Sequence, residues 1–399
     1  MRGLQIIDMA PGAEGVAALS AALRHRLEAG GPAVAPLPGP SRHMSAEYIA
    51  TVRRAVSAES VPDDVVAVIS TSGSTGRPRG VGLTEGNLRA SARLADLRRP
   101  GLAGCDWVLA LPATSIGGFN VVARSLIGGT ALHVLPSVGG AATFDPADVT
   151  SVPVDRPYAV SVVPAQLQSL LEHAPGAQWL ARAHTVLIGG AATSADVLAR
   201  ARAIGIEAVA TYGMTESTGG CVFDGVPLDD VQVDLDAAGR ITLRGPVIAA
   251  GYLDGSDDGD FVGPPESRQF LTSDIGEWAS GRLRIVGRID DVVTVHGVNV
   301  ALGAIEDALH SFEGVRDAAV VARPDPRSGH RLIAYVVFRG SAKPPLSHFA
   351  DLVRERLGGA ARPDVVEVDS LPHLPNGKID RRALQTLGDQ HDSSAQKDD

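Results

Sequence analysis

Cysteine is nearly absent from this chain of 399 residues, which contains only Cys105 and Cys221. The two lie far apart and lack C-x-x-C spacing. The sequence therefore predicts neither a disulfide framework nor a zinc site, and a reducing compartment such as the cytoplasm is expected. Positive charge is also in the minority: the chain has 36 Lys and Arg residues against 46 Asp and Glu residues, which gives a formal net charge of −10. Without a dense basic stripe, no nucleic-acid partner is expected.

Long apolar runs are missing as well. No run is long and apolar enough to span a bilayer, and the first eight residues (MRGLQIID) lack the apolar block of a signal peptide. Membrane insertion is therefore not expected. The chain is nevertheless 44% hydrophobic, which is enough for a sizeable core, and its length allows two or three domains.

A loop rich in glycine and hydroxyl groups is the first feature that points to chemistry. The apolar run 65–69 (VVAVI) predicts a short buried strand, and residues 70–80 (STSGSTGRPRG) follow it directly. Glycines let backbone N–H groups approach a ligand, hydroxyls add donors, and arginine adds a permanent charge, which together suit phosphates. The Walker pattern does not fit, because Gly73 and Gly76 are too close together and no Lys follows. A flexible linker is the alternative, but strand signals on both sides favour a phosphate-binding loop.

Apolar runs alternate with helical stretches between residues 107 and 208. Strands are predicted at 108–111, 130–135, 159–163 and 185–188, and helices at 119–126, 166–173 and 196–203. Such alternation is typical of a parallel sheet built from βαβ units, in which ligands bind beyond the carboxyl ends of the strands. We therefore expect the loops after Ile69, Leu111, Ile188 and Ala210 to surround one site.

The rest of the chain frames this region. Upstream, helices are predicted at 15–29, 45–57 and 84–97, with a Gly/Pro loop over residues 30–40. Downstream, residues 232–252 and 282–286 indicate antiparallel β-structure in a small barrel-like part. A compact α+β pattern follows, with helices at 304–310 and 347–357 and strands at 318–322, 332–338 and 365–368. The predicted fold is thus α/β, with a large domain of residues 1–289, a small α+β domain of residues 290–387 and a disordered polar tail at 388–399.

Four more stretches carry candidate ligand groups. Residues 188–192 (IGGAA) follow a strand and have small side chains on which a flat ring could lie. Residues 211–216 (TYGMTE) offer an aromatic face, a hydroxyl and a carboxylate. Asp274 could accept hydrogen bonds from both hydroxyls of a ribose, and Lys378 lies on a turn within residues 375–380 (PNGKID). Taken singly, Tyr212 is more often a core aromatic, and Glu216 or Lys378 a solvated charge; the combination carries the interpretation.

From residue 65 to about residue 384, this combination resembles the adenylate-forming superfamily, which includes acyl-CoA synthetases, peptide-synthetase adenylation domains and luciferases. The resemblance implies an AMP-binding domain followed by a mobile lid domain, and a reaction in two steps. A carboxylate attacks the α-phosphate of MgATP to give an acyl-adenylate and pyrophosphate, and a thiol, usually that of CoA, then displaces AMP. The implied cofactors are ATP and Mg²⁺, with CoA as co-substrate and a small carboxylic acid as substrate. Related enzymes are often dimers, so a homodimer is left open.

The resemblance also implies a role for each matching position. The nucleotide is expected to contact the phosphate loop, the adenine loop and the ribose-binding residues: Thr71, Ser72, Gly73, Ser74, Thr75, Gly76, Arg79, Gly190, Ala191, Tyr212, Gly213, Met214, Asp274 and Arg288. At position 79 the family usually has Lys. Thr215 would contact the α-phosphate, and Glu216 would hold Mg²⁺, which commonly uses one carboxylate plus phosphate oxygens. Lys378 would bridge the attacking carboxylate and the α-phosphate and stabilise charge in the transition state.

Two further positions match the family's hinge residue and a glycine beside its thiol tunnel. Asp290 matches the hinge about which the small domain swings between the two half-reactions. Gly297 matches a glycine beside the pantetheine tunnel, where a side chain would block the thiol.

Within the superfamily, the chain is similar to the short actinobacterial o-succinylbenzoate–CoA ligases of menaquinone synthesis, through residues 187–191, 211–228 and 287–291. The expected acid pocket comprises Ser115, Gly118, Phe119, Gln166, Gly189 and Thr211. Ser115 replaces a histidine that is common in the family, and Asn299 and Leu302 replace a common arginine and proline. These departures leave open a ligase for another aryl or acyl acid, with CoA, a carrier protein or an amine as acceptor. A non-catalytic nucleotide-binding relative is the alternative from a different class.

Overall fold

The computed structural model divides the chain into two compact units. It describes residues 2–10, 12–39, 46–58, 61–71, 78–138, 144–152, 155–254, 259–312, 314–340, 344–372, 379–381 and 383–387. The first unit comprises Met1–Asp236, Ile241–Thr272 and Ala279–Leu283, and the second comprises Ala237–Arg240, Ser273–Trp278 and Arg284–Asp399. The predicted boundary at Asp290 stays a prediction, and the predicted tail at 388–399 lies outside the described residues.

The first sheet of the first unit has the strand order β1-β2-β3-β4-β14. Its strands are β1 (Leu4–Met9), β2 (Ala33–Pro38), β3 (Val65–Thr71), β4 (Arg79–Thr84) and β14 (Gly251–Tyr252). The first three run parallel, whereas β4 is antiparallel to both β3 and β14. Two helices pack against these strands, α1 (Ala13–Ala29) and α2 (Ala46–Val56), the latter through Val52 and Val56.

Strand β2 corrects the prediction of a Gly/Pro loop over residues 30–40. All six of its residues are buried, and it pairs with β1 from Leu4↔Ala33 to Met9↔Pro38. Proline cannot donate to a strand ladder, so Pro36 and Pro38 argue against an inner strand in a sequence pattern. Burial of Ala33, Val34 and Leu37 between the sheet's neighbours outweighs that preference.

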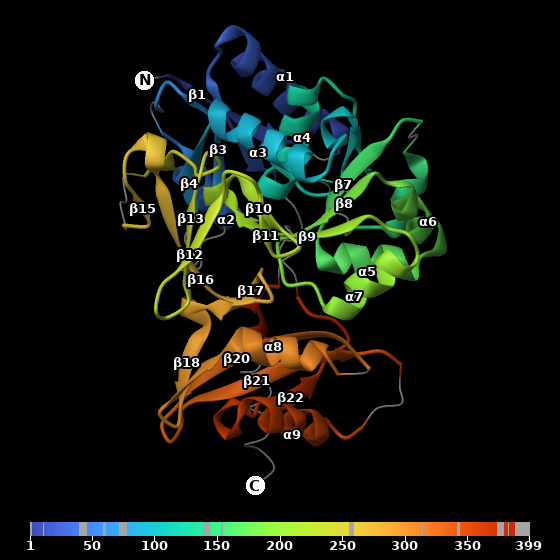
Figure 1. The fold of residues 1–399 in the computed structure, drawn as a ribbon, viewed down its shortest axis with the longest axis vertical. Helices are drawn as coiled ribbons and strands as arrows, with labels where there is room; N and C mark the ends of the chain where they lie inside the picture. The colour runs from blue at the N-terminus through green and yellow to red at the C-terminus, as the bar shows by residue number, and fades with distance from the viewer. Residues whose placement is uncertain are drawn as a thin grey trace. The chain divides into compact units, whose positions relative to one another are not determined.

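The second sheet has seven strands in the order β11-β10-β9-β8-β7-β5-β6. They are β5 (Asp106–Leu109), β6 (Leu132–Val134), β7 (Tyr158–Val162), β8 (Thr185–Ile188), β9 (Ala208–Met214), β10 (Gly219–Phe223) and β11 (Val226–Pro227). Figure 1 labels strands β7 to β11 of this sheet. Strands β5 to β9 are parallel, which confirms the predicted βαβ architecture. The helices between or beside them are α3 (Glu85–Arg98), α4 (Ile116–Gly128), α5 (Pro164–Glu172), α6 (Ala174–Arg182) and α7 (Ala195–Ala203).

The four loops that were expected to surround one site come from two sheets. Strand β3, which contains Ile69, belongs to the first sheet, whereas β5, β8 and β9 belong to the second. Strand β3 nevertheless contacts the 3₁₀ turn Thr215–Ser217, which follows β9 of the second sheet. Two sheets therefore contribute to one region of the first unit.

A third sheet has the order β12-β13-β16-β15, with β17 paired to β16. Its strands are β12 (Gln232–Leu235), β13 (Arg240–Arg244), β15 (Phe261–Val262), β16 (Gln269–Ala279) and β17 (Arg282–Arg288). The pairing of β12 with β13 is antiparallel, as predicted for residues 232–252. The pairing of β15 with β16 is also antiparallel, but it lies outside the predicted ranges. Other short 3₁₀ segments of the chain lie at Leu102–Gly104, Pro146–Ser151, Pro265–Ser267, Ile289–Asp291 and Gly359–Ala361.

The second unit has a hairpin of β18 (Val292–Val295) and β19 (Val298–Ala301) and a sheet in the order β20-β21-β22. The sheet strands are β20 (Val315–Asp325), β21 (Gly329–Phe338) and β22 (Asp364–Glu367), and α8 (Leu302–His310) and α9 (Leu346–Leu357) pack on them (Figure 1). Side chains alternate between two cores: Val320 faces the helices with Ile305 and Phe349, while Val321 joins Leu371 on the other side.

Candidate active site

The turn after β9 holds the predicted α-phosphate and magnesium residues rigidly. Thr215 and Glu216 are 7% and 8% exposed. The hydroxyl of Ser217 accepts a bond from the backbone N–H of Met214 at 3.0 Å. Thr218 has a left-handed φ of 54°, and its hydroxyl donates to the carbonyl of Val247 at 2.6 Å. These bonds fix the backbone that carries both predicted residues.

Strand β9 requires glycine at position 213. Thr211, Tyr212, Gly213 and Met214 lie along this strand, which turns back into β10. At Gly213 a Cβ would lie 1.9 Å from the carbonyl oxygen of Gly219, a distance that no side chain can adopt. The strand pair is therefore close enough at this point only with glycine.

Glu216 has a partner that the sequence did not reveal. The hydroxyl of Tyr252 donates to the Oε1 atom of Glu216 at 2.9 Å. Burial, and then the Glu216 carboxylate, raises the pKa of Tyr252 far above its usual range, so the phenol stays a neutral donor. The two residues are 36 positions apart, and no local pattern distinguishes Tyr252 from an ordinary sheet aromatic. A single buried carboxylate fits Mg²⁺, which binds through one or two carboxylates plus substrate phosphates.

Arg79 lies at the start of β4, where its backbone pairs with Thr71 of β3. The predicted phosphate residues Ser72, Gly73, Ser74, Thr75 and Gly76 lie between these two strands, outside the described residues. The guanidinium of Arg79 lies over the ring of Tyr252, 3.2 Å from its centroid, and is 3.8 Å from carboxylate oxygens of both Asp254 and Asp260. The structure thus brings Thr71, Arg79 and Glu216 into one region.

The predicted adenine-binding loop follows β8. The hydroxyl of Thr211 in β9 donates to the carbonyl of Ile188, the last residue of β8, at 3.0 Å, so the predicted loop starts beside β9. At Gly189 a Cβ would approach the Thr211 hydroxyl to 2.6 Å, and Gly190 has a φ of 85°. Gly189 is therefore favoured by the nearby Thr211 side chain and Gly190 by its backbone conformation, while Gly190 and Ala191 remain exposed. Their contact with adenine stays a prediction.

Two of the predicted acid-pocket residues tie the loops at the carboxyl ends of β5 and β7. Ser115 caps helix α4: its hydroxyl donates to the carbonyl of Pro112 at 2.8 Å and accepts from the N–H of Gly118 at 3.5 Å. The side chain of Gln166 accepts from the N–H of Val163 and donates to the carbonyl of Ala110 at 2.8 Å. These bonds place both side chains at the edge where parallel sheets bind ligands.

Two other predicted pocket residues have tight surroundings. A Cβ at Gly118 would lie 2.2 Å from the carbonyl oxygen of Pro112, so this helix start requires glycine. Phe119 is fully buried at 0% exposure, which gives its ring a packing role in the core. Its contact with the acid substrate stays a prediction.

In the second unit, the predicted ribose residues form an ion pair. A guanidinium nitrogen of Arg288 lies 3.1 Å from Oδ1 of Asp274, and another lies 3.2 Å from Oδ2 of Asp290. Burial opposes the charge of Arg288, but the carboxylates of Asp274 and Asp290 outweigh it and raise its pKa. The pair joins the predicted ribose residues to the predicted hinge residue.

Gly297 lies at the tip of the β18–β19 hairpin with a φ of 79°, next to His296 at 49°. Two successive left-handed residues in a two-residue loop are typical of a type I′ turn. A Cβ at Gly297 would meet no described atom within 4 Å, so the turn, rather than crowding, favours glycine here. The predicted role of Gly297 beside a thiol stays a prediction.

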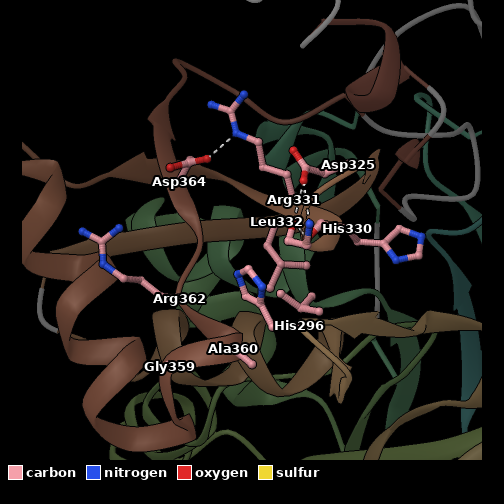
Figure 2. A pocket seen from close by; sticks show the side chains of 11 residues that line it. His296, Asp325, His330, Arg331, Leu332, Gly359, Ala360, Arg362 and Asp364 are labelled. Carbon is pink, nitrogen blue, oxygen red and sulfur yellow. Dashed lines mark hydrogen bonds and ion pairs between the residues drawn. The ribbon is translucent and has the colours of Figure 1, made fainter.

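Figure 2 shows a cavity of the second unit beside this hairpin tip. His296, His330, Arg331, Arg362, Asp325 and Asp364 line it together with apolar neighbours. Arg331 pairs with Asp364 at 2.6 Å, and Arg362 pairs with Asp351 at 3.1 Å. The charges on this surface are therefore largely matched within the protein.

Lys378 lies in the segment 373–378, outside the described residues. The residues on either side are held firmly. The N–H of Asp380 donates to the carbonyl of Pro372 at 2.8 Å. Arg381 forms two bonds to Glu306, at 2.8 and 2.9 Å, and a third to the carbonyl of Val320. This ion pair was also absent from the sequence-based prediction.

Cys221 shows that neither cysteine is suited to covalent chemistry. Both thiols are buried, and burial raises the pKa of Cys221 to about 12. The thiolate is the reactive form, so we expect Cys221 to react with a disulfide reagent at pH 8 only after the protein unfolds. A thiol titration with and without denaturant measures this; fast labelling of Cys221 in the folded protein would contradict the burial described here.

Comparison with known proteins defines the class of the chain. The profile of the AMP-binding enzyme family matches residues 27–253, and that of the AMP-binding enzyme C-terminal domain matches residues 304–378. A probable 2-succinylbenzoate–CoA ligase of Mycobacterium tuberculosis is 38% identical over 332 residues, which cover 82% of this chain and 85% of that protein. The chain belongs to the AMP-binding enzyme family.

More distant relatives and solved structures agree. The 2-succinylbenzoate–CoA ligase of Enterococcus faecalis is 29% identical, over 81% of this chain and 70% of that protein. The o-succinylbenzoate CoA synthetase of Bacillus subtilis, solved with an acyl-adenylate intermediate, matches with a TM-score of 0.70 at 21% identity, over 96% of this chain and 88% of that one. The amide bond synthetase McbA of Marinactinospora thermotolerans matches with a TM-score of 0.72 at 24% identity, over 96% and 80%.

These findings confirm three predictions made from the sequence: the adenylate-forming superfamily, the α/β fold class with a large and a small domain, and an AMP-forming ligase of this family. The structural likenesses, below 25% identity, support the fold alone. Within the described residues, no helix is long and apolar enough to cross a membrane.

Proposed function

We propose that the protein is an ATP-dependent carboxylate–CoA ligase and that its acid is 2-succinylbenzoate. The observation that carries the proposal is the 38% identity, over 82% of the chain, to a protein named as a probable ligase for this acid. The B. subtilis synthetase of the same fold has been solved with ATP and a magnesium ion. ATP, Mg²⁺ and CoA are accordingly the proposed cofactors and co-substrate.

The chemistry proceeds in two balanced steps. An oxygen of the acid attacks the α-phosphorus of ATP, a new P–O bond forms, and the bond to the β-phosphate oxygen breaks to release pyrophosphate. The CoA sulfur, having lost its proton, then attacks the acyl carbon, and the bond to AMP breaks. Bound Mg²⁺ would neutralise charge on the phosphates during the first step.

The resemblance to adenylate-forming enzymes supports the following roles for this chain's residues. Glu216 would hold the metal ion, and Thr215 would donate to the α-phosphate from a turn fixed by Ser217. Arg79 would bind the outer phosphates. In the second unit Asp274 and Arg288 would bind the ribose, and Lys378 would bridge the attacking carboxylate and the α-phosphate.

A second candidate is a ligase for another aryl or acyl acid. Ser115 favours it, because this side chain is small, is engaged in capping α4, and replaces a histidine expected beside the acid. A cytoplasmic location, a homodimer and the absence of a nucleic-acid partner stay predictions from composition and resemblance.

Pyrophosphate release measured with MgATP across a panel of acids, with and without CoA, tests the proposal. We expect the fastest release with 2-succinylbenzoate, and a CoA thioester as the final product. No turnover of this acid together with turnover of another would overturn the substrate and support the second candidate. No pyrophosphate release with any acid would overturn the ligase function itself.

A further inference from the structure

Tyr252 contacts the two groups that the proposed function assigns to Mg²⁺ and to the phosphates. Its hydroxyl donates to Oε1 of Glu216 at 2.9 Å, and its ring faces the guanidinium of Arg79 at 3.2 Å. The three residues come from the turn after β9 and from β14 and β4, which lie far apart in the sequence. One side chain thus links the carboxylate to the arginine.

The backbone of Tyr252 is fixed to the strand that carries Arg79. In the β14–β4 pair, Tyr252 lies opposite Val81, and the N–H of Leu253 donates to the carbonyl of Gly80 at 2.9 Å. The ring is also packed edge-on against Phe261, with centroids 5.0 Å apart. The position of the tyrosine is therefore set before any ligand binds.

The ring contact gives a physical reason for arginine at position 79, where lysine is usual in the family. A planar guanidinium stacks on an aromatic face, whereas an ammonium is a compact and strongly hydrated point charge. Asp254 and Asp260, each 3.8 Å from Arg79, further orient the guanidinium. Lysine at this position would keep the charge and lose the stacking.

The hydroxyl contact acts on the other group. A hydrogen bond to one oxygen of a carboxylate restricts the rotation of the whole group, and bonds to charged acceptors are stronger than neutral ones. This bond, from the Tyr252 hydroxyl to Oε1 of Glu216 at 2.9 Å, comes from a side chain whose backbone is already fixed in the β14–β4 pair. Glu216 is held in one orientation as a result.

We propose that Tyr252 is a positioning residue with two separable actions: its hydroxyl orients Glu216 for Mg²⁺, and its ring orients Arg79 for the phosphates of ATP. The inference rests on the proposed function for its ligands. It goes beyond that function because Tyr252 is not one of the residues assigned to Mg²⁺ or to the phosphates. It also gives a reason for the arginine at position 79.

The two actions are separated by two substitutions. Tyr252→Phe removes the hydroxyl and keeps the ring, while Tyr252→Leu removes both. Tyr158→Phe is a control that removes the same hydroxyl from the same unit, since Tyr158 is buried and its hydroxyl donates to the backbone carbonyl of Trp179 instead. Calorimetric binding of a non-hydrolysable ATP analogue, with Mg²⁺ and with a chelator, gives a readout that needs no turnover.

For Tyr252→Phe we expect the affinity in Mg²⁺ to fall about 10- to 100-fold, as for loss of a bond to a charged group, with the affinity in chelator unchanged. For Tyr252→Leu the affinities with Mg²⁺ and with chelator should both fall. Arg79→Lys should then lower the affinity less in the Tyr252→Leu background than in the wild type, because the stacking is already lost. Tyr158→Phe should leave both affinities unchanged.

An Mg²⁺-dependent affinity of Tyr252→Phe within twofold of wild type would overturn the role of the hydroxyl. Independent, additive effects of Tyr252→Leu and Arg79→Lys would overturn the role of the ring. The pyrophosphate assay is separate: nucleotide binding that responds to these substitutions without any pyrophosphate release would refute the ligase function and leave the coupling intact.

Discussion

The Arg381→Met variant is expected to lose about 2–4 kcal/mol of the free energy of unfolding of the second unit at neutral pH. Its partner Glu306 has a side chain only 14% exposed, and Arg381 binds both of its carboxylate oxygens. Removing the arginine leaves a buried carboxylate without its main counter-charge. The figure lies below that for fully buried pairs because the Arg381 side chain is 35% exposed.

The loss should depend on pH in a defined direction. Burial raises the pKa of Glu306 above its ordinary value of 4.5, although Arg381 opposes the shift. Without Arg381 the pKa rises further. A carboxyl group whose pKa is higher in the folded state favours folding below its unfolded pKa and opposes it as the pH rises. The variant should therefore approach wild-type stability as the pH falls below about 4.5 and diverge from it above.

Denaturant unfolding followed at several pH values measures this effect, with Arg331→Met as the matched control. Arg331 pairs with Asp364 in the same unit, but both side chains are about half exposed, so its loss should cost no more than about 1 kcal/mol. The double variant Glu306→Gln with Arg381→Met should recover part of the stability, because no charge is then left buried. Equal losses for Arg381→Met and Arg331→Met would show that burial does not strengthen the Glu306 pair.

The sequence predicted those features in which a local pattern and a function coincide. The strand at 185–188 and the small residues after it were recognised together, and the structure indeed brings Gly189 against Thr211 of the neighbouring strand. Strand β2 was missed because its prolines contradict the local signal, and only burial between neighbouring strands makes it a strand.

The partners of the predicted site residues were missed for a different reason. Tyr252 and Glu216 are 36 residues apart, and Glu306 and Arg381 are 75 residues apart. No periodic pattern in the sequence links the two residues of either pair. Taken alone, each residue resembles an ordinary sheet aromatic or surface charge. Motifs therefore indicated the groups assigned to ligands, while the groups that hold them in place required the folded chain.

The Lys378→Ala variant is expected to lose about 100- to 1,000-fold in the rate of pyrophosphate release, as on removal of one group that stabilises charge in a transition state. Attack by CoA on a supplied acyl-adenylate should stay within about threefold of wild type, because the α-phosphate is no longer being attacked in that step. Around the segment 373–378, the N–H of Asp380 donates to the carbonyl of Pro372, and Arg381 pairs with Glu306. Single-turnover measurements of each half-reaction provide the test.

The composition of the chain gives this experiment a clean control. Lysine occurs at only three positions, Lys343, Lys378 and Lys397, so most positive charge is carried by arginine. Lys343→Ala removes the same group from the second unit and should leave both half-reactions unchanged. If Lys378→Ala slowed both half-reactions equally, the lysine would be acting on the stability or placement of the unit, and not on the charge at the α-phosphate. A selective loss of the first half-reaction would instead assign that charge to Lys378.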